Sequence, residues 1–144
     1  MKKLINLLGI GILSLAGCAT TNSCLVEDVN SILAMNKLGI PKKFENYKNQ
    51  KMNFAGVVEI YGHIFYAKHY DINNDGKPDV GELYGVFGFF GKGDVITTAK
   101  PIYYGFDFNL DNKMDSSEML FDENSDGLNG NEEWVVQSKI STSI

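Results

Sequence analysis

Three stretches of this chain carry Asp, Asn and Asp at alternate positions, and each has a Glu eleven residues after its first Asp. They read DINNDGKPDVGE (71–82), DFNLDNKMDSSE (107–118) and DENSDGLNGNEE (122–133), and are called loops one, two and three below. Calcium takes about six to eight oxygen ligands at roughly 2.3–2.6 Å, and a tightly turned loop supplies them from positions 1, 3, 5, 7, 9 and 12. The repeated register therefore predicts up to three Ca²⁺ sites.

Loop one has a suitable residue at every ligand position. The expected ligands are the side chains of Asp71, Asn73, Asp75, Asp79 and Glu82 and the main-chain carbonyl of Lys77. Gly76 suits the left-handed backbone expected at position 6. Pro78 lacks the N–H that paired EF-hand loops use at position 8 to bridge two loops. We therefore expect a calcium cage between arms that are not helical.

Loop two follows the same pattern with Asn112 at position 6, where Asn is the next-best residue after Gly. The expected ligands are Asp107, Asn109, Asp111, Asp115 and Glu118 and the carbonyl of Lys113. The spacing of Asp115 and Glu118 is also typical of a helix N-terminus closed by a capping box. Capping alone would explain these two residues without a metal ion.

In loop three, Gly130 stands at position 9, so water is expected to complete the ligand shell. The expected ligands are Asp122, Asn124, Asp126 and Glu133 and the carbonyl of Leu128. Only three apolar residues separate loops two and three. We predict a short helix over 116–121, shared by both loops, which would place Glu118 and Asp122 on one face.

The three segments resemble EF-hand and EF-hand-like calcium loops over 36 of the 144 residues. The offset of 36 residues between loops one and two also matches paired EF-hands. However, the sequence between them is rich in Gly and in β-forming residues and does not resemble two helices. The resemblance therefore implies the ligand sets and not the helix–loop–helix architecture. Tandem acidic loops of dockerins and thrombospondin-type repeats are similar too, and no motif selects either family.

The elements that must position these loops are mainly predicted strands. Dense Val, Ile, Phe and Tyr over 57–70 indicate a strand broken at Gly62. A Gly-Lys-Gly-Asp turn between 83–90 and 95–99 predicts a hairpin, and 102–106 predicts a short strand that leads into loop two. With a helix before the strands and a helix between the loops, the expected class is α+β, as a small single domain.

The N-terminus resembles a secretory targeting signal. Lys2 and Lys3 precede an apolar run over 4–15, and the Leu-Ala-Gly-Cys ending at Cys18 resembles the lipobox of bacterial lipoproteins. The resemblance implies cleavage before Cys18 and acylation of this residue, with palmitate as an expected chain. An ordinary secretory signal is the alternative, because the run is shorter than the ~20 residues that span a bilayer. Ala19 in place of Asp favours the outer membrane if the cell has two.

The expected organisation is a signal peptide over 1–17, a lipidated tether with an amphipathic helix over 18–50, and a calcium-binding domain over 51–144. Apolar residues recur at helical spacing over 25–38. Their face could dock on the domain, lie on the membrane or meet a partner, and docking is the default. Cys24 would have no intrachain partner after acylation of Cys18, so no disulfide framework is expected.

Charge narrows the classes of partner. Fourteen of the eighteen carboxylates and only four lysines lie between Asp71 and Glu133, a formal charge of −10 for that region. Such a field repels nucleic acid, so nucleic-acid binding is not expected. The favoured function is that of a calcium-binding lipoprotein of the bacterial cell envelope, with structural ions in a scaffold or interaction module and no enzymatic activity.

Three alternatives stay open at this level. The loops could be ordinary polar turns, since Asp, Asn and Gly are common turn residues. A small envelope hydrolase could use His63 and His69, which share strand parity, although no catalytic spacing accompanies them. A calcium-dependent adhesion or recognition module could contact a glycan or an envelope protein through exposed aromatic residues, for which the candidates are Tyr61, Tyr84, Tyr103, Tyr104 and Trp134.

Overall fold

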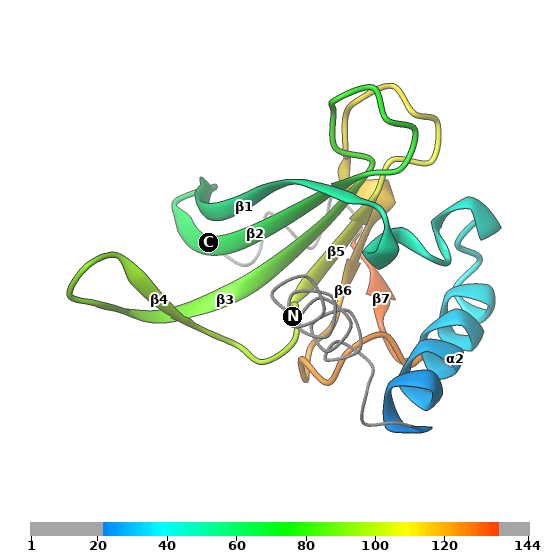
Figure 1. Cartoon of the computed structure of the whole chain (residues 1–144), viewed down its shortest axis with the longest axis horizontal. Helices are drawn as coiled ribbons and strands as arrows, with labels where there is room; N and C mark the ends of the chain where they lie inside the picture. Colours follow the sequence, from blue (N-terminus) through cyan, green and yellow to red (C-terminus); the bar gives the residue numbers. More distant parts are fainter. Residues whose placement is uncertain (1–21, 136–144) are drawn as a thin grey trace, which may run out of the picture.

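The structure is a computed structural model that describes residues 22–135, with side chains from Val29 onward. The signal-peptide, Cys18 and 136–144 regions lie outside the described residues. Seven antiparallel strands form one sheet in the order β1-β2-β3-β5-β6-β7, and β4 pairs with the far end of β3 (Figure 1). The strands are β1 (Lys51–Ile60), β2 (His63–Asp71), β3 (Val80–Phe90), β4 (Asp94–Thr97), β5 (Tyr103–Phe106), β6 (Met119–Phe121) and β7 (Glu133–Trp134).

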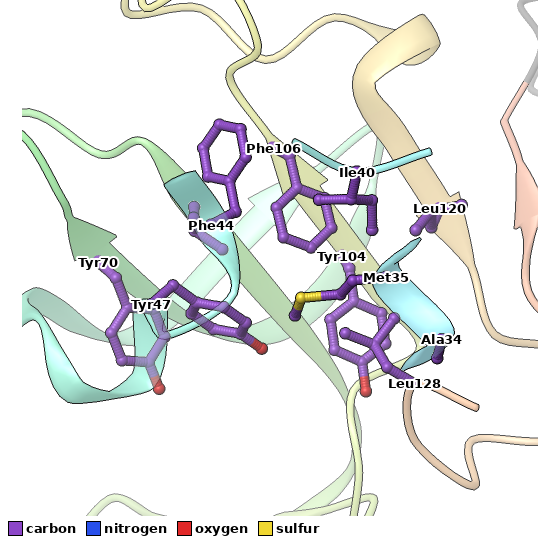
Figure 2. Packing of buried hydrophobic residues seen from close by; sticks show 11 residues of the cluster. Ala34, Met35, Ile40, Phe44, Tyr47, Tyr70, Tyr104, Phe106, Leu120 and Leu128 are labelled. Atoms are coloured by element: carbon purple, nitrogen blue, oxygen red, sulfur yellow. The ribbon is translucent and has the colours of Figure 1, made fainter. Parts of the chain in front are cut away.

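One face of the sheet carries the main core. Helix α2 (Asn22–Lys37) and the short 3₁₀ turns η1 (Lys42–Phe44) and η2 (Tyr47–Asn49) pack on this face. Figure 2 shows their buried residues against those of the strands. The core cluster is Ala34, Met35, Ile40, Phe44, Tyr47, Tyr70, Val80, Tyr104, Phe106, Leu120 and Leu128. The helix predicted over 25–38 is present as α2, and it contributes Ala34 and Met35 to the core, whereas Val29 and Leu33 of the predicted apolar face are 55% and 62% exposed.

The predicted break at Gly62, the predicted hairpin and the predicted short strand are confirmed. The break at Gly62 is a two-residue turn between β1 and β2, in which Tyr61 and Gly62 both have positive φ, 51° and 78°. Two positive φ values in succession are the geometry that matches the twist of a tight hairpin. The second hairpin joins β3 to β4, and the predicted short strand appears as β5.

The predicted α+β class is wrong, because the described chain is essentially all-β and none of the three loops lies between two helices. The helix expected over 116–121 is also wrong. Its first half is a single 3₁₀ turn, η3 (Ser116–Glu118), and its second half is strand β6. Strand β6 bridges β5 and β7, and Leu120 at its centre is completely buried against Tyr104. Burial between two strands favours the extended backbone over a helix of six residues.

Candidate metal-binding loops

The three loops share one backbone conformation. In each, the residues at positions 4 and 6 have positive φ, with values between 52° and 96°. These residues are Asn74 and Gly76 in loop one, Leu110 and Asn112 in loop two, and Ser125 and Gly127 in loop three. Positions 3 and 5 also meet in the same way each time, because the Asn amide donates to the Asp carboxylate at 3.1–3.3 Å. The sequence repeat is therefore a structural repeat.

Loop one joins β2 to β3 and closes at position 9. The Asp71 carboxylate is buried and accepts the N–H groups of Asp75 (3.2 Å) and Gly76 (2.7 Å). The Asp79 carboxylate, which has no exposed surface, accepts those of Ile72 (2.8 Å) and Asn73 (3.1 Å). Four of the predicted ligand side chains, at positions 1, 3, 5 and 9, are thus brought together.

Glu82, the predicted position-12 ligand of loop one, lies elsewhere. It is the third residue of β3, is 1% exposed, and its carboxylate accepts the hydroxyl groups of Tyr47 (2.5 Å) and Tyr84 (2.8 Å). Tyr70 lies at 3.4 Å and the Lys48 ammonium at 3.7 Å from the same carboxylate. Burial, together with the charge of Glu82, holds the pKa of Tyr47 well above its usual value. Glu82 thus belongs to a buried tyrosine network below the loop.

Loop two follows the predicted twelve-residue pattern more closely. Asp107 has no exposed surface and accepts the N–H groups of Asp111 (3.1 Å) and Asn112 (2.7 Å). Glu118 is also buried and accepts the N–H of Phe108 at 3.0 Å, so the side chain at position 12 is hydrogen-bonded to the backbone at position 2. In loop one, Asp79 at position 9 makes the corresponding hydrogen bond to the backbone at position 2. The loop thus gathers its predicted first and last ligands.

The capping box predicted in loop two is confirmed. Asp115 accepts the N–H of Ser117 at 2.8 Å, and Glu118 accepts the N–H of Asp115 at 3.2 Å. The hydrogen bonds from the Ser117 side chain and backbone hold the pKa of Asp115 below its ordinary value. Both residues thus have a capping role, and Glu118 reaches the loop as well.

Loops one and two are neighbours at one end of the sheet (Figure 1, green and yellow at the top). The N–H of Asp107 donates to the carbonyl of Asp79 at 2.9 Å, which joins the first residue of loop two to position 9 of loop one. Together with Asp71 and Glu118, these residues place four buried carboxylates in two adjoining loops. Buried negative charge is costly unless it is hydrogen-bonded and offset by positive charge.

Loop three lies at the opposite end of β6 and contains an orphaned carboxylate oxygen. Asp122 has no exposed surface, and its Oδ2 accepts the N–H of Gly127 at 2.9 Å. Its Oδ1 is buried and has no hydrogen-bond partner among residues 22–135. In loops one and two the corresponding oxygen accepts the N–H of position 5. A buried charged oxygen without a donor is the kind of atom that a cation satisfies.

Loop three also corrects the predicted ligand set. Glu133, expected at position 12, is exposed in β7, whereas the neighbouring Glu132 is buried and accepts the N–H groups of Asn129 (2.7 Å) and Gly130 (2.8 Å). Sequence reasoning missed Glu132, because two successive glutamates cannot be told apart without knowing which one faces inward. Lys37 of α2 donates to the Gly130 carbonyl at 2.8 Å and ties this loop to the helix.

The three position-7 residues, whose carbonyls were expected as ligands, are also placed. The N–H groups of Lys77 and Lys113 donate to the position-5 carboxylate of their own loops at 2.8 and 2.9 Å. Leu128 instead buries its side chain in the core. Within the described part of the chain, no three Asp, Glu, His or Cys side chains are arranged to hold a metal ion as they stand. The donors present in the loops are all oxygens, the class that calcium prefers.

The two histidines do not form one site. They stand six residues apart on the continuous strand β2, which separates them by roughly 20 Å. His69 packs on Phe54 with 5.1 Å between ring centroids, and burial lowers its pKa. His63 is exposed at the other end of the strand. This separation gives no geometric support to a hydrolase that uses both.

The aromatic candidates for recognition are distributed unevenly. Tyr104 is buried in the core and Tyr61 is 77% exposed, while the others are partly buried. Between residues 22 and 135, no helix has both the length and the apolar character needed to cross a membrane. The chain matches no family model, no curated protein and no solved structure.

Proposed function

We propose that this chain is a calcium-binding lipoprotein of the bacterial cell envelope, in which the ions stabilise a small β domain. The observation that carries the proposal is the buried, unpartnered Oδ1 of Asp122 inside a loop conformation that occurs three times. Ordinary polar turns satisfy their own carboxylates. Loop three leaves one negative oxygen that only a donor or a cation from outside the described chain would satisfy.

The residues that would hold calcium are oxygen donors of the three loops. They are Asp71, Asn73, Asp75 and Asp79 in loop one, Asp107, Asn109, Asp111 and Glu118 in loop two, and Asp122, Asn124 and Asp126 in loop three. At positions 3 and 5 the Asn amide now donates to the Asp carboxylate, so ion binding requires the amide to turn its oxygen inward. When bound, calcium supplies positive charge that offsets the buried carboxylates.

A structural role fits the placement of the loops better than a sensing role. Loop one joins β2 to β3 and loop two joins β5 to η3 and β6, so an ion in either loop would link strands of the sheet. Extracellular calcium modules often bind at about 10⁻⁴–10⁻³ M, where calcium is abundant and occupancy is constant. Each occupied site adds about 2.7 kcal/mol of stability at a hundredfold excess of ion over Kd.

The anchor is the second part of the proposal and rests on the lipobox resemblance at Cys18. Four backbone steps separate Cys18 from Asn22, where α2 begins, and this length spans at most about 14 Å. An acylated Cys18 would therefore hold the helix close to the bilayer surface. Replacement of Cys18 by Ser should release the protein from the membrane fraction, and retention of this variant in that fraction would refute the anchor.

The calcium part is tested by thermal unfolding of the mature chain with calcium and with a chelator. We expect a higher melting temperature in calcium and a smaller rise in magnesium, because magnesium requires a stricter octahedral shell. Asp71→Asn and Asp107→Asn should each reduce the rise. A melting temperature that is the same in calcium and in chelator would exclude structural calcium.

A further inference from the structure

A cavity of about 650 Å³ opens on the face of the sheet opposite the main core. Its wall is a row of side chains across three neighbouring strands, because Leu83 of β3 pairs with Tyr103 of β5 and Tyr103 pairs with Phe121 of β6. The adjacent residue Tyr104 points to the other face and belongs to the core. A volume of this size lies within the range of roughly 300–1,000 Å³ that is typical of small-molecule sites.

The wall is aromatic along most of its length. The Tyr103 ring lies 5.1 Å from that of Phe121 and 5.9 Å from that of Phe65, measured between centroids. Tyr61 also lines the cavity, and Trp134 borders it while its ring packs on Phe108, with 5.5 Å between centroids. Two of the five aromatic residues suggested for recognition, Tyr61 and Tyr103, thus line the same cavity. Aromatic faces attract apolar groups and also cations.

The mouth of the cavity has negative charge. Glu123 and Glu133, near the two ends of loop three, are exposed and line the cavity together with the exposed residues Asn124 and Asn131. Of the described residues that line the cavity, none is a lysine, and His63 is the one basic side chain among them. An organic cation would gain both from the aromatic wall and from the carboxylates, whereas an anion of the same shape would be repelled.

We infer that this cavity binds an organic cation, an amine or a quaternary ammonium group on an apolar body. The apolar body lies against Phe65, Tyr103 and Phe121, and the positive group lies near Glu123. This recognition function goes beyond calcium binding and uses neither the buried oxygen of Asp122 nor loops one and two. Loop three connects the two functions, because it forms the mouth of the cavity.

The test uses three probes of equal length in calcium-containing buffer: octylamine, octanol and octanoate. Binding is measured by isothermal titration calorimetry, because the ring of Trp134, the only tryptophan of the chain, packs on Phe108 and against the main core. We expect octylamine to bind at least about tenfold more tightly than octanol, and octanoate to bind most weakly. Added salt should reduce the preference for the amine. Equal affinity for the three probes, or no binding of octylamine, would overturn the inference.

A pair of variants isolates the charge at the mouth. Glu123→Gln should weaken octylamine binding by about three- to tenfold and leave octanol binding unchanged. Asp94→Asn in the β3–β4 hairpin removes an exposed carboxylate outside the cavity and should change neither affinity. Glu123 is exposed, so its replacement should preserve the fold, which circular dichroism checks. Equal loss of octylamine affinity in both variants would refute the assignment.

The result is separable from the calcium proposal. Calcium binding is measured on the same protein without probe. Amine binding by a protein that binds no calcium would support the cavity and refute the metal sites. Calcium binding without any preference for the amine would support the metal sites and refute the cavity.

Discussion

Replacement of Asp122 by Asn should have opposite consequences with and without calcium. Asn keeps an oxygen that can accept the N–H of Gly127, now at 2.9 Å from Oδ2, and it removes the charge of the buried Oδ1 that has no partner. Without calcium the variant should therefore be at least as stable as the wild type, because an unpaired buried charge is costly. With calcium it should lose the contribution of loop three.

The size of the effect follows from the number of sites lost. One site contributes about 2.7 kcal/mol at a hundredfold excess of ion over Kd. For a domain of this size, 1 kcal/mol shifts the melting temperature by roughly 4 °C, so Asp122→Asn should reduce the calcium-induced rise by on the order of 10 °C. When calcium is removed, the variant should thus have a melting temperature equal to or higher than that of the wild type.

The matched control is Asp107→Asn in loop two. Both oxygens of Asp107 accept N–H groups, from Asp111 and Asn112. The Asn amide would place a donor against one of these N–H groups, so this variant should be less stable by about 1–3 kcal/mol even in chelator. The assay is thermal unfolding followed by circular dichroism, in calcium and in chelator. An equal loss of stability by Asp122→Asn in both buffers would refute the reasoning.

Three further predictions concern the framework of the loops. Tyr47→Phe removes a donor to the buried Glu82 and should lower the free energy of unfolding, measured in urea, by about 1.5–3 kcal/mol. Tyr61→Phe, at an exposed turn, is the control and should leave this free energy unchanged. Equal free energies of unfolding for the two variants would contradict the buried network. Burial and Glu82 raise the pKa of Tyr47 and Tyr84. The stability that these tyrosines give to the fold is therefore fully present below pH about 10, the pKa of tyrosine in the unfolded chain, and is lost at higher pH as the raised pKa values are approached. Unfolding measured across this range should show falling stability together with phenolate absorbance, and constant stability would count against it. Leu110→Asn should raise the melting temperature and add about 0.5–1 kcal/mol to the free energy of unfolding, because Leu110 has φ 56° and Asn tolerates this backbone better. A lower melting temperature would indicate that the packing of the Leu side chain matters more.

The sequence predicted local features well. The alternation of apolar residues and the turn at Gly62 identified the strands, because these signals involve neighbouring residues. The loop pattern identified position 6 as a left-handed residue in loops one and two, including Asn112 with φ 68°. It also placed Glu118 both in a capping box and at the close of loop two.

The failures arose where distant segments decide the outcome. Strand β3 begins at Val80, directly after the ninth position of loop one, so Glu82 turns into the core, where Tyr47 from 35 residues earlier in the chain reaches it. The segment 119–121 is extended because it pairs with β5 and β7, partners that no local pattern names. Short apolar runs are ambiguous between helix and strand until their neighbours are known.

The most direct test of calcium binding is a calorimetric titration of the mature chain with calcium, with magnesium as competitor. We expect saturable binding of up to three calcium ions, with magnesium competing weakly, and fewer bound ions in Asp122→Asn. The absence of bound calcium at millimolar concentrations would contradict the proposed function.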